Sequence, residues 1–269
     1  MQPCGCFSAE RLWPGFETFL LYRQESRNPG GSALSLFKMI KIIGTSHIAK
    51  QSIEEVKAAI TAEKPDILAL ELDRNRFYAL TTKRQGSSRV AITELGLKGY
   101  LFYILGSWLQ RHLGRAVGIS PGAEMKLAVK LASKYNIKIA LIDQDIRVTL
   151  RKLSARIRWR EKLNFMLDIL KAVFFGKKMM KKMGLERIDL SRVPTDELIE
   201  KLIAPLKQRY PATYYTLVEE RNRIMARNLV ELSLREPEAK ILAIVGAGHK
   251  KGLSNELSRL LSSEPLVAG

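Results

Sequence analysis

Residues 239–249 read Ala-Lys-Ile-Leu-Ala-Ile-Val-Gly-Ala-Gly-His, an apolar run that stops at a glycine and is soon followed by a histidine. The run shows no alternation of apolar and polar residues, so it predicts a strand buried on both faces. Residues 40–47, Ile-Lys-Ile-Ile-Gly-Thr-Ser-His, repeat this arrangement near the other end of the chain. Such strands are typical of a parallel sheet that is covered by helices.

Two further apolar runs, Ile67–Leu70 and Ile137–Ile142, complete the set of predicted strands. Amphipathic spacing predicts helices over Lys50–Glu63 and Gly122–Tyr135, between these strands. The chain is therefore expected to have an α/β fold. Its central sheet is expected to be largely parallel or mixed, with helices on its faces.

All four predicted strands stop at residues that can carry chemistry. In parallel sheets, ligands bind beyond the carboxyl ends of the strands, so these side chains are expected to meet along one edge. The set comprises His47, Glu71, Asp73, Asp143, Asp145 and His249. A chance occurrence stays open as the alternative, because Gly-x-x-His alone is a weak pattern.

These motifs resemble those of the TraB/PrgY/GumN family, which includes the Tiki metalloproteases, and most resemble TraB-type members from archaea and bacteria. The matching residues run from Met39 to about Leu260. They are Gly44-Thr45-Ser46-His47 with Ser52, Glu71-Leu72-Asp73 with Arg76, Pro121-Gly122-Ala123-Glu124-Met125, Asp143-Gln144-Asp145-Ile146 with Thr149, Glu220-Arg221-Asn222 and Gly246-Ala247-Gly248-His249.

The resemblance implies an α/β fold with the two histidines close together. It also implies a metal-dependent hydrolase or peptidase that acts on peptides, with a role in shutting down pheromone-like peptide signals. The expected cofactor is a divalent ion such as Zn, Mn, Co or Fe, because imidazole and carboxylate groups suit these metals.

Roles for the site residues follow from their chemistry. We expect His47 and His249 to bind the metal with a carboxylate from Glu71 or Glu124, and the remaining glutamate to act as general base. The guanidinium of Arg221 suits a substrate carboxylate or a developing oxyanion. Asp143 and Asp145 are expected to orient imidazoles, and Asp73 to add a binding group.

Structural roles stay open for the same residues. The histidines can bond backbone groups, Glu71 can cap a helix or pair with Arg76, and Glu124 can face a helix dipole. Arg221 can simply pair with a glutamate, and the aspartates can be structural. Acid–base hydrolysis without an ion is a further alternative, since the His-Glu-x-x-His helix of zinc proteases is absent from the sequence.

The chain is strongly basic, with 45 Lys and Arg against 27 Asp and Glu and a net charge of +18. Between the third and fourth predicted strands lies a helical insertion, at about residues 147–235. Residues 147–187 hold thirteen basic and three acidic residues. This predicts either a solvated helical hairpin or a helix that meets an anionic membrane surface or partner. The alternative function is therefore a non-catalytic signalling or membrane-surface binding module.

Other function classes find no support. The sequence has no zinc finger, no RNP-like aromatic motif, no Walker loop and no Gly-x-Gly-x-x-Gly after a strand, so no nucleic-acid or nucleotide partner is expected. No signal peptide or transmembrane helix is predicted, which favours a location in the cytoplasm or at the inner face of the membrane. The oligomeric state is open, a homodimer included.

The first 38 residues differ from the rest and contain both cysteines. No helical or strand period persists through them, and the clean pattern begins at Met39. Residues 1–38 are therefore expected to be a non-native or disordered extension, with a native extension packed on the domain as the alternative. Residues 39–269 are expected to form one TraB-like α/β domain.

Overall fold

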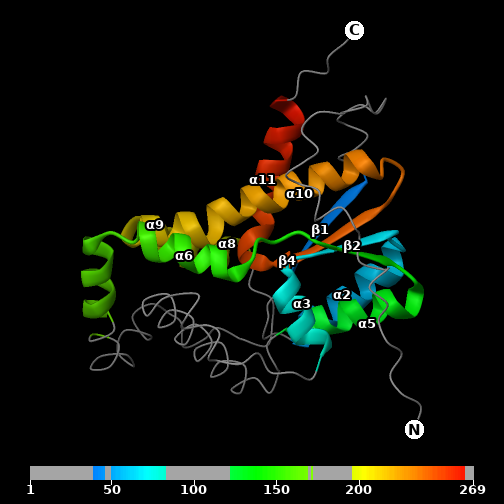
Figure 1. Ribbon diagram of the computed structural model, residues 1–269, viewed down its shortest axis with the longest axis horizontal. Coiled ribbons are helices and arrows are strands. Elements are labelled where there is room, and N and C mark those ends of the chain that lie inside the picture. Colours follow the sequence, from blue (N-terminus) through cyan, green and yellow to red (C-terminus); the bar gives the residue numbers. More distant parts are fainter. Residues whose placement is uncertain (1–38, 46–49, 83–121, 169–170, 172–195, 264–269) are drawn as a thin grey trace.

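The structure, a computed structural model, describes residues 39–45, 50–82, 122–168, 171 and 196–263 (Figure 1). At its centre is a four-stranded sheet in the order β1-β4-β2-β3, in which all neighbours are parallel. The strands are β1 (Ile40–Thr45), β2 (Ile67–Leu70), β3 (Lys138–Leu141) and β4 (Ile241–Gly246). The predicted α/β fold with a parallel sheet is confirmed.

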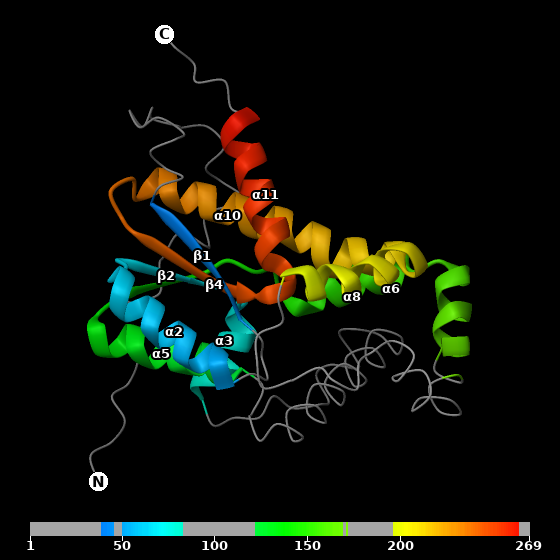
Figure 2. The same cartoon turned by 180° about the vertical axis from the view of Figure 1, so that it is seen from behind.

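Helices cover both faces of this sheet (Figures 1 and 2). One face packs against α2 (Lys50–Glu63), α3 (Arg74–Thr81) and α5 (Ala123–Tyr135). The other face packs against α10 (Glu220–Arg235) and α11 (Ala247–Ser263). This arrangement explains the unbroken apolar strands, because each strand must supply apolar side chains to two cores.

Strand β4 shows this division residue by residue. Leu242 and Ile244 enter the core under α2 and α5, whereas Ile241, Ala243 and Val245 enter the core under α10 and α11. All of β4 is buried. Alternate residues of a strand point to opposite faces, so the same short apolar run supports both layers.

The strand register aligns the carboxyl ends of β1 and β4, where the two Gly-x-x-His motifs begin. Gly44 pairs with Val245 and Thr45 with Gly246 in the parallel β1–β4 ladder. Both strands thus end at the same level of the sheet. His47 itself lies outside the described residues.

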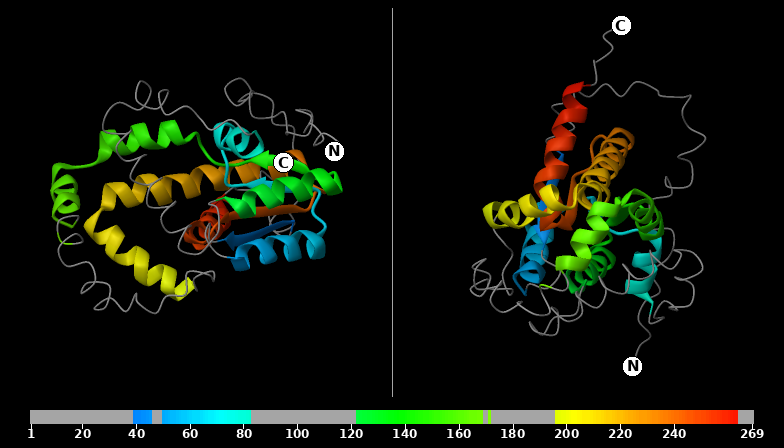
Figure 3. Two further views of the ribbon diagram at one scale, coloured as in Figure 1. Left: turned by 90° about the horizontal axis from the view of Figure 1, so that it is seen from below. Right: turned by 90° about the vertical axis from the view of Figure 1, so that its left-hand side faces the viewer.

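The predicted helical insertion between the third and fourth strands is also confirmed for the described residues. The helices that follow β3 are α6 (Ile146–Arg156), residues 159–168, α8 (Asp196–Arg209), α9 (Pro211–Tyr214), the π-helix η4 (Tyr215–Glu219) and α10. From α9 through η4, the chain runs straight into α10 and so links the far end of the insertion to the sheet (Figure 3). Pro205 lies inside α8.

No helix among the described residues is long and apolar enough to cross a membrane. The predictions for residues 1–38 concern a segment that lies outside the described part of the chain.

Candidate functional site

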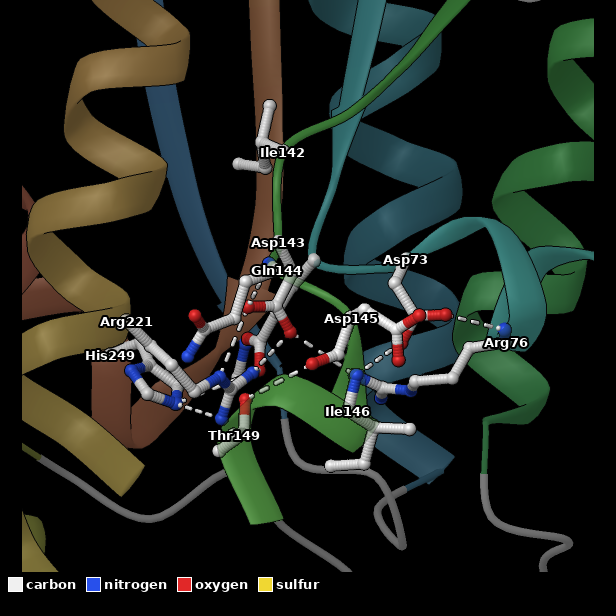
Figure 4. A network of polar contacts seen from close by, with 12 residues as sticks. Asp73, Arg76, Ile142, Asp143, Gln144, Asp145, Ile146, Thr149, Arg221 and His249 are labelled. Carbon is white, nitrogen blue, oxygen red and sulfur yellow. Dashed lines mark hydrogen bonds and ion pairs between the residues drawn. The ribbon is translucent and has the colours of Figure 1, made fainter. Parts of the chain in front are cut away.

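A cluster of buried polar side chains lies beyond the carboxyl ends of β2, β3 and β4 (Figure 4). Glu71 directly follows β2, Asp143 lies two residues after β3, and His249 lies in the first turn of α11. Their exposed fractions are 2%, 3% and 8%. The structure thus brings together three of the predicted site residues.

Arg221, in the first turn of α10, is the centre of this cluster. Its Nε and Nη2 donate to the two carboxylate oxygens of Asp143, at 3.1 and 2.7 Å, in a bidentate pair. The same Nη2 also donates to Oε1 of Glu71. Burial acts to lower the pKa of Arg221, but the charges of Asp143 and Glu71 outweigh it and raise the pKa above its ordinary value.

His249 is held by α10 through two contacts. Its Nε2 lies 3.0 Å from Nη1 of Arg221, and its Nδ1 lies 2.7 Å from Oδ1 of Asn222. Because arginine nitrogens only donate, Nε2 of His249 accepts and carries no proton. The ring proton is then on Nδ1, which donates to Asn222. The tautomer with the proton on Nδ1 satisfies both contacts, and in this assignment Nε2 faces the cluster.

Asn222 is a site residue that the sequence reasoning missed. It was noted only as part of the Glu-Arg-Asn motif, although its position directly after Arg221 was the available signal. Gly252 on α11 makes room for it: a Cβ at that position would lie 2.2 Å from Nδ2 of Asn222. The absence of a side chain at residue 252 therefore lets Asn222 reach the imidazole.

Glu71 ties the end of β2 to the turn that precedes His249. Its Oε2 accepts a hydrogen bond from the backbone N–H of Gly246 at 2.6 Å, while its Oε1 accepts from Arg221. The alternative of a Glu71–Arg76 ion pair is not what the structure shows. Arg76 instead lies 3.3 Å from Oδ2 of Asp143, so Asp143 is bound by two arginines.

Two of the predicted aspartates cap helices. Oδ1 of Asp73 accepts from the backbone N–H of Arg76 and caps α3, and its Oδ2 accepts from the N–H of Ile146 at 3.3 Å. Burial raises the pKa of Asp73 above its ordinary value, more than these bonds lower it. Asp145 caps α6 through the N–H of Arg147. Burial acts to raise the pKa of Asp145, but its bonds with Arg147 lower it overall.

The sequence predicts that Asp143 and Asp145 orient imidazoles, but the structure shows neither aspartate bonded to the ring of His249. The carboxylate of Asp143 contacts Arg221, Arg76 and the N–H of Gln144, and that of Asp145 contacts Arg147 and Asn75. The group that orients the described imidazole is the side-chain amide of Asn222.

Of the two remaining predicted site residues, the structure describes Glu124 but not His47. Glu124 is buried, with 1% exposed, in the first turn of α5, where a carboxylate faces the positive end of the helix dipole. His47 lies outside the described residues, so its expected role as a ligand stays a prediction.

The donor atoms of the cluster allow a test of the implied metal. Nε2 of His249 and Oε1 of Glu71 are 3.6 Å apart, which two ligands at about 2.0–2.2 Å from one ion can span. Both atoms, however, are bonded to the guanidinium of Arg221. Among the described residues, no group of three or more His, Cys, Asp or Glu side chains could hold an ion. In this arrangement Arg221 binds both described ligand atoms, and the third predicted ligand, His47, lies outside the described residues, so the metal stays a prediction.

Comparison with known proteins supports the resemblance. An uncharacterized protein of Methanocaldococcus jannaschii is 37% identical over 227 residues, which cover 82% of this chain and 54% of that protein. The TraB domain-containing proteins of mouse and human are each 24% identical over 253 residues, covering 85% of this chain and 65% of theirs. The chain thus spans between half and two thirds of the length of these relatives.

The family model for TraB/PrgY/gumN matches residues 37–262, which include all six strand-end residues and the whole of the described Arg221 cluster. The chain belongs to the TraB/PrgY/gumN family.

Proposed function

We propose that this chain is a hydrolase that acts on peptides, and that the cluster of Glu71, Asp143, Arg221, Asn222 and His249 is its active site. The observation that carries the proposal is the burial of two carboxylates, a guanidinium and an imidazole at the carboxyl edge of a parallel sheet. Ligands of open α/β sheets bind at this edge. Apolar residues of similar size can replace buried ion pairs with little loss of stability, so folding alone does not require such a cluster.

The state of His249 supports a role as general base. In the tautomer that satisfies both of its contacts, Nε2 is the unprotonated nitrogen and faces the cluster, while Asn222 holds the ring through Nδ1. In the proposed reaction, a water molecule gives a proton to Nε2 while its oxygen attacks the carbonyl carbon of a peptide bond. The carbon–nitrogen bond then breaks, and the proton on Nε2 passes to the leaving amine.

Arg221 supports the same reaction as an electrostatic group. Its Nη1 bonds Nε2 of His249 and the backbone carbonyl of Leu217, and in the proposed reaction a substrate carbonyl oxygen takes the place of His249 as the acceptor of this donor. Glu71 and Asp143 hold the other side of the guanidinium, through Nη2 and Nε, and thereby position it. A fixed donor placed where negative charge develops stabilises the transition state.

The peptide substrate, the link to pheromone-like signals and a divalent ion enter the proposal through the resemblance. A Zn, Mn, Co or Fe ion would supply an activated water, and His47, His249 and Glu71 are the residues proposed to hold it. The acid–base route uses no ion. A metal-dependent route needs Arg221 to move, because Arg221 binds both described ligand atoms. We further propose a location in the cytoplasm or at the inner face of a membrane.

Peptide turnover by purified protein tests this proposal. The wild type and His249→Gln are incubated with a mixed peptide library, and the products are identified by mass spectrometry. We expect cleavage by the wild type and a loss of at least about 100-fold in the variant, the size of a general acid–base contribution. A matched control is Asn255→Ala, on the same helix. Equal cleavage by wild type and His249→Gln would overturn the proposal.

The same preparations decide the question of the ion. Elemental analysis and a chelator separate the two routes: bound Zn, Mn, Co or Fe together with loss of cleavage in chelator supports the metal-dependent route. Cleavage that is unchanged in chelator supports the acid–base route. No cleavage of any peptide by the folded wild type supports the non-catalytic signalling module instead.

A further inference from the structure

The helix of residues 159–168 stands at the end of the insertion that is farthest from the sheet among the coloured elements of Figures 1 and 2. It belongs to the most basic part of the sequence, residues 147–187. The hydrolase proposal assigns nothing to this helix.

One face of the helix is bound to the junction between α8 and α9. The buried carboxylate of Glu161 accepts from the N–H of Ala212 at 2.7 Å and from both the N–H and the hydroxyl of Thr213, at 3.3 and 3.0 Å. Asp168 is bonded by the guanidinium of Arg209 and by the hydroxyl of Tyr210. Polar groups therefore hold the inner face.

The opposite face is apolar and exposed. Trp159 is 77% exposed, Met166 54%, Leu163 43% and Leu167 40%. These positions are spaced by four, seven and eight residues from Trp159, the spacing of a single stripe along a helix. The usual arrangement of a surface helix is thus reversed, since the apolar stripe faces away from α8 and α9, the described helices that this helix contacts.

Basic residues border this stripe. At 3.6 residues per turn, Arg160 lies along one side of it and Lys162 along the other, and both are exposed. Arg158, directly before the helix, and Lys171 are exposed as well. The acidic residues of the helix, Glu161 and Asp168, are those that bind the protein. The outer face is therefore an apolar stripe between cationic borders.

We propose that this helix lies flat on an anionic lipid membrane, with Trp159, Leu163, Met166 and Leu167 at the boundary between headgroups and acyl chains. An apolar stripe flanked by Lys and Arg is the pattern of interfacial helices, and tryptophan favours this depth of the bilayer. The positive charge of this face distinguishes between two partners, a second copy of the chain and an anionic membrane. A second copy of the chain would bring the same cationic borders into contact with these, whereas anionic headgroups complement them.

Vesicle sedimentation of the full chain tests the proposal, with phosphatidylcholine vesicles that contain or lack phosphatidylserine. We expect the wild type to bind the anionic vesicles at least about tenfold more tightly than the neutral ones, since each basic residue near the surface contributes about fivefold. The double variant Arg160→Gln/Lys162→Gln should lose most of that preference. Trp159→Ala should weaken binding at least about fivefold, because the largest apolar side chain of the stripe is removed.

Tyr135→Ala is the matched control, an exposed aromatic residue with a neighbouring lysine on α5. It should bind anionic vesicles as the wild type does. Circular dichroism checks that each variant is folded. Equal binding to both kinds of vesicle, or binding unchanged by Trp159→Ala, overturns the proposal. A dimer in sedimentation equilibrium that Trp159→Ala dissociates overturns it in favour of a second copy.

Discussion

Replacement of Arg221 by methionine removes the one cation that joins two buried carboxylates. The side chain of Arg221 is 14% exposed, and those of Glu71 and Asp143 are 3% and 2% exposed. When the guanidinium is lost, Arg76 still binds Asp143 and the N–H of Gly246 still bonds Glu71, but no described cation joins the two buried carboxylates. The loss of one partner from a buried pair costs about 3–5 kcal/mol of unfolding free energy. We expect Arg221→Met to fall within that range, and Arg221→Lys to recover only part of the loss, since lysine lacks the bidentate geometry.

Urea unfolding followed by circular dichroism measures this loss, with Arg235→Met as a matched control. Arg235 lies on the same helix and pairs with Glu231, but its side chain is 34% exposed, so its removal should cost less than about 1 kcal/mol. A loss below about 1 kcal/mol at neutral pH would refute the view of Arg221 as the shared buried cation.

Three further predictions concern the neighbours of this cluster. Gly252→Ala should lower the unfolding free energy measured in urea by about 1–3 kcal/mol, because the added Cβ displaces Asn222 from His249. The same substitution should lower the unfolding free energy less in an Asn222→Ala background. Equal losses in both backgrounds would contradict the packing argument. Glu220 is partly buried, but its bonds with two basic residues of α6 lower its pKa overall. The stability that Glu220 adds is therefore present at neutral pH and is lost as pH falls through that lowered pKa. The difference in unfolding free energy between wild type and Glu220→Gln should vanish in acid, and a difference that stays constant with pH would contradict this prediction. Asp73→Asn should keep the cap of α3, with an unfolding free energy within about 1 kcal/mol of that of the wild type. Asp73→Ala should lower the unfolding free energy by about 0.5–2 kcal/mol. Equal losses in the two variants would argue against a capping role.

The strand-end residues were predictable because apolar runs determine the sheet and parallel strands align their carboxyl ends. Glu71, Asp143 and His249 follow such runs directly, so their proximity follows from topology. The partners of these residues were not predictable in the same way. Arg221 comes from the insertion, and its reach to Glu71, 150 residues away in sequence, depends on how α10 packs against the sheet.

The roles of Asn222 and Gly252 depend on contacts between two helices. The periodicity of the sequence does not predict which residues of two helices touch each other. Asn222 reaches His249 only because residue 252 has no side chain. The outward stripe of the helix at residues 159–168 was ambiguous for a related reason. Its apolar spacing predicts an amphipathic helix, but the direction of each face is decided by Glu161 and Asp168, whose partners lie on α8 and α9 or at their junction.

Peptide turnover by Glu71→Gln tests the central claim most directly. Glutamine keeps the shape of Glu71 but removes the charge that positions Arg221 and bonds the N–H of Gly246. With folding checked by circular dichroism, we expect the wild type to cleave peptides and this variant to lose at least about 100-fold in rate. The control Glu63→Gln, at the end of α2, should cleave as the wild type does. Wild-type rates in Glu71→Gln would contradict the assignment of this cluster as the active site.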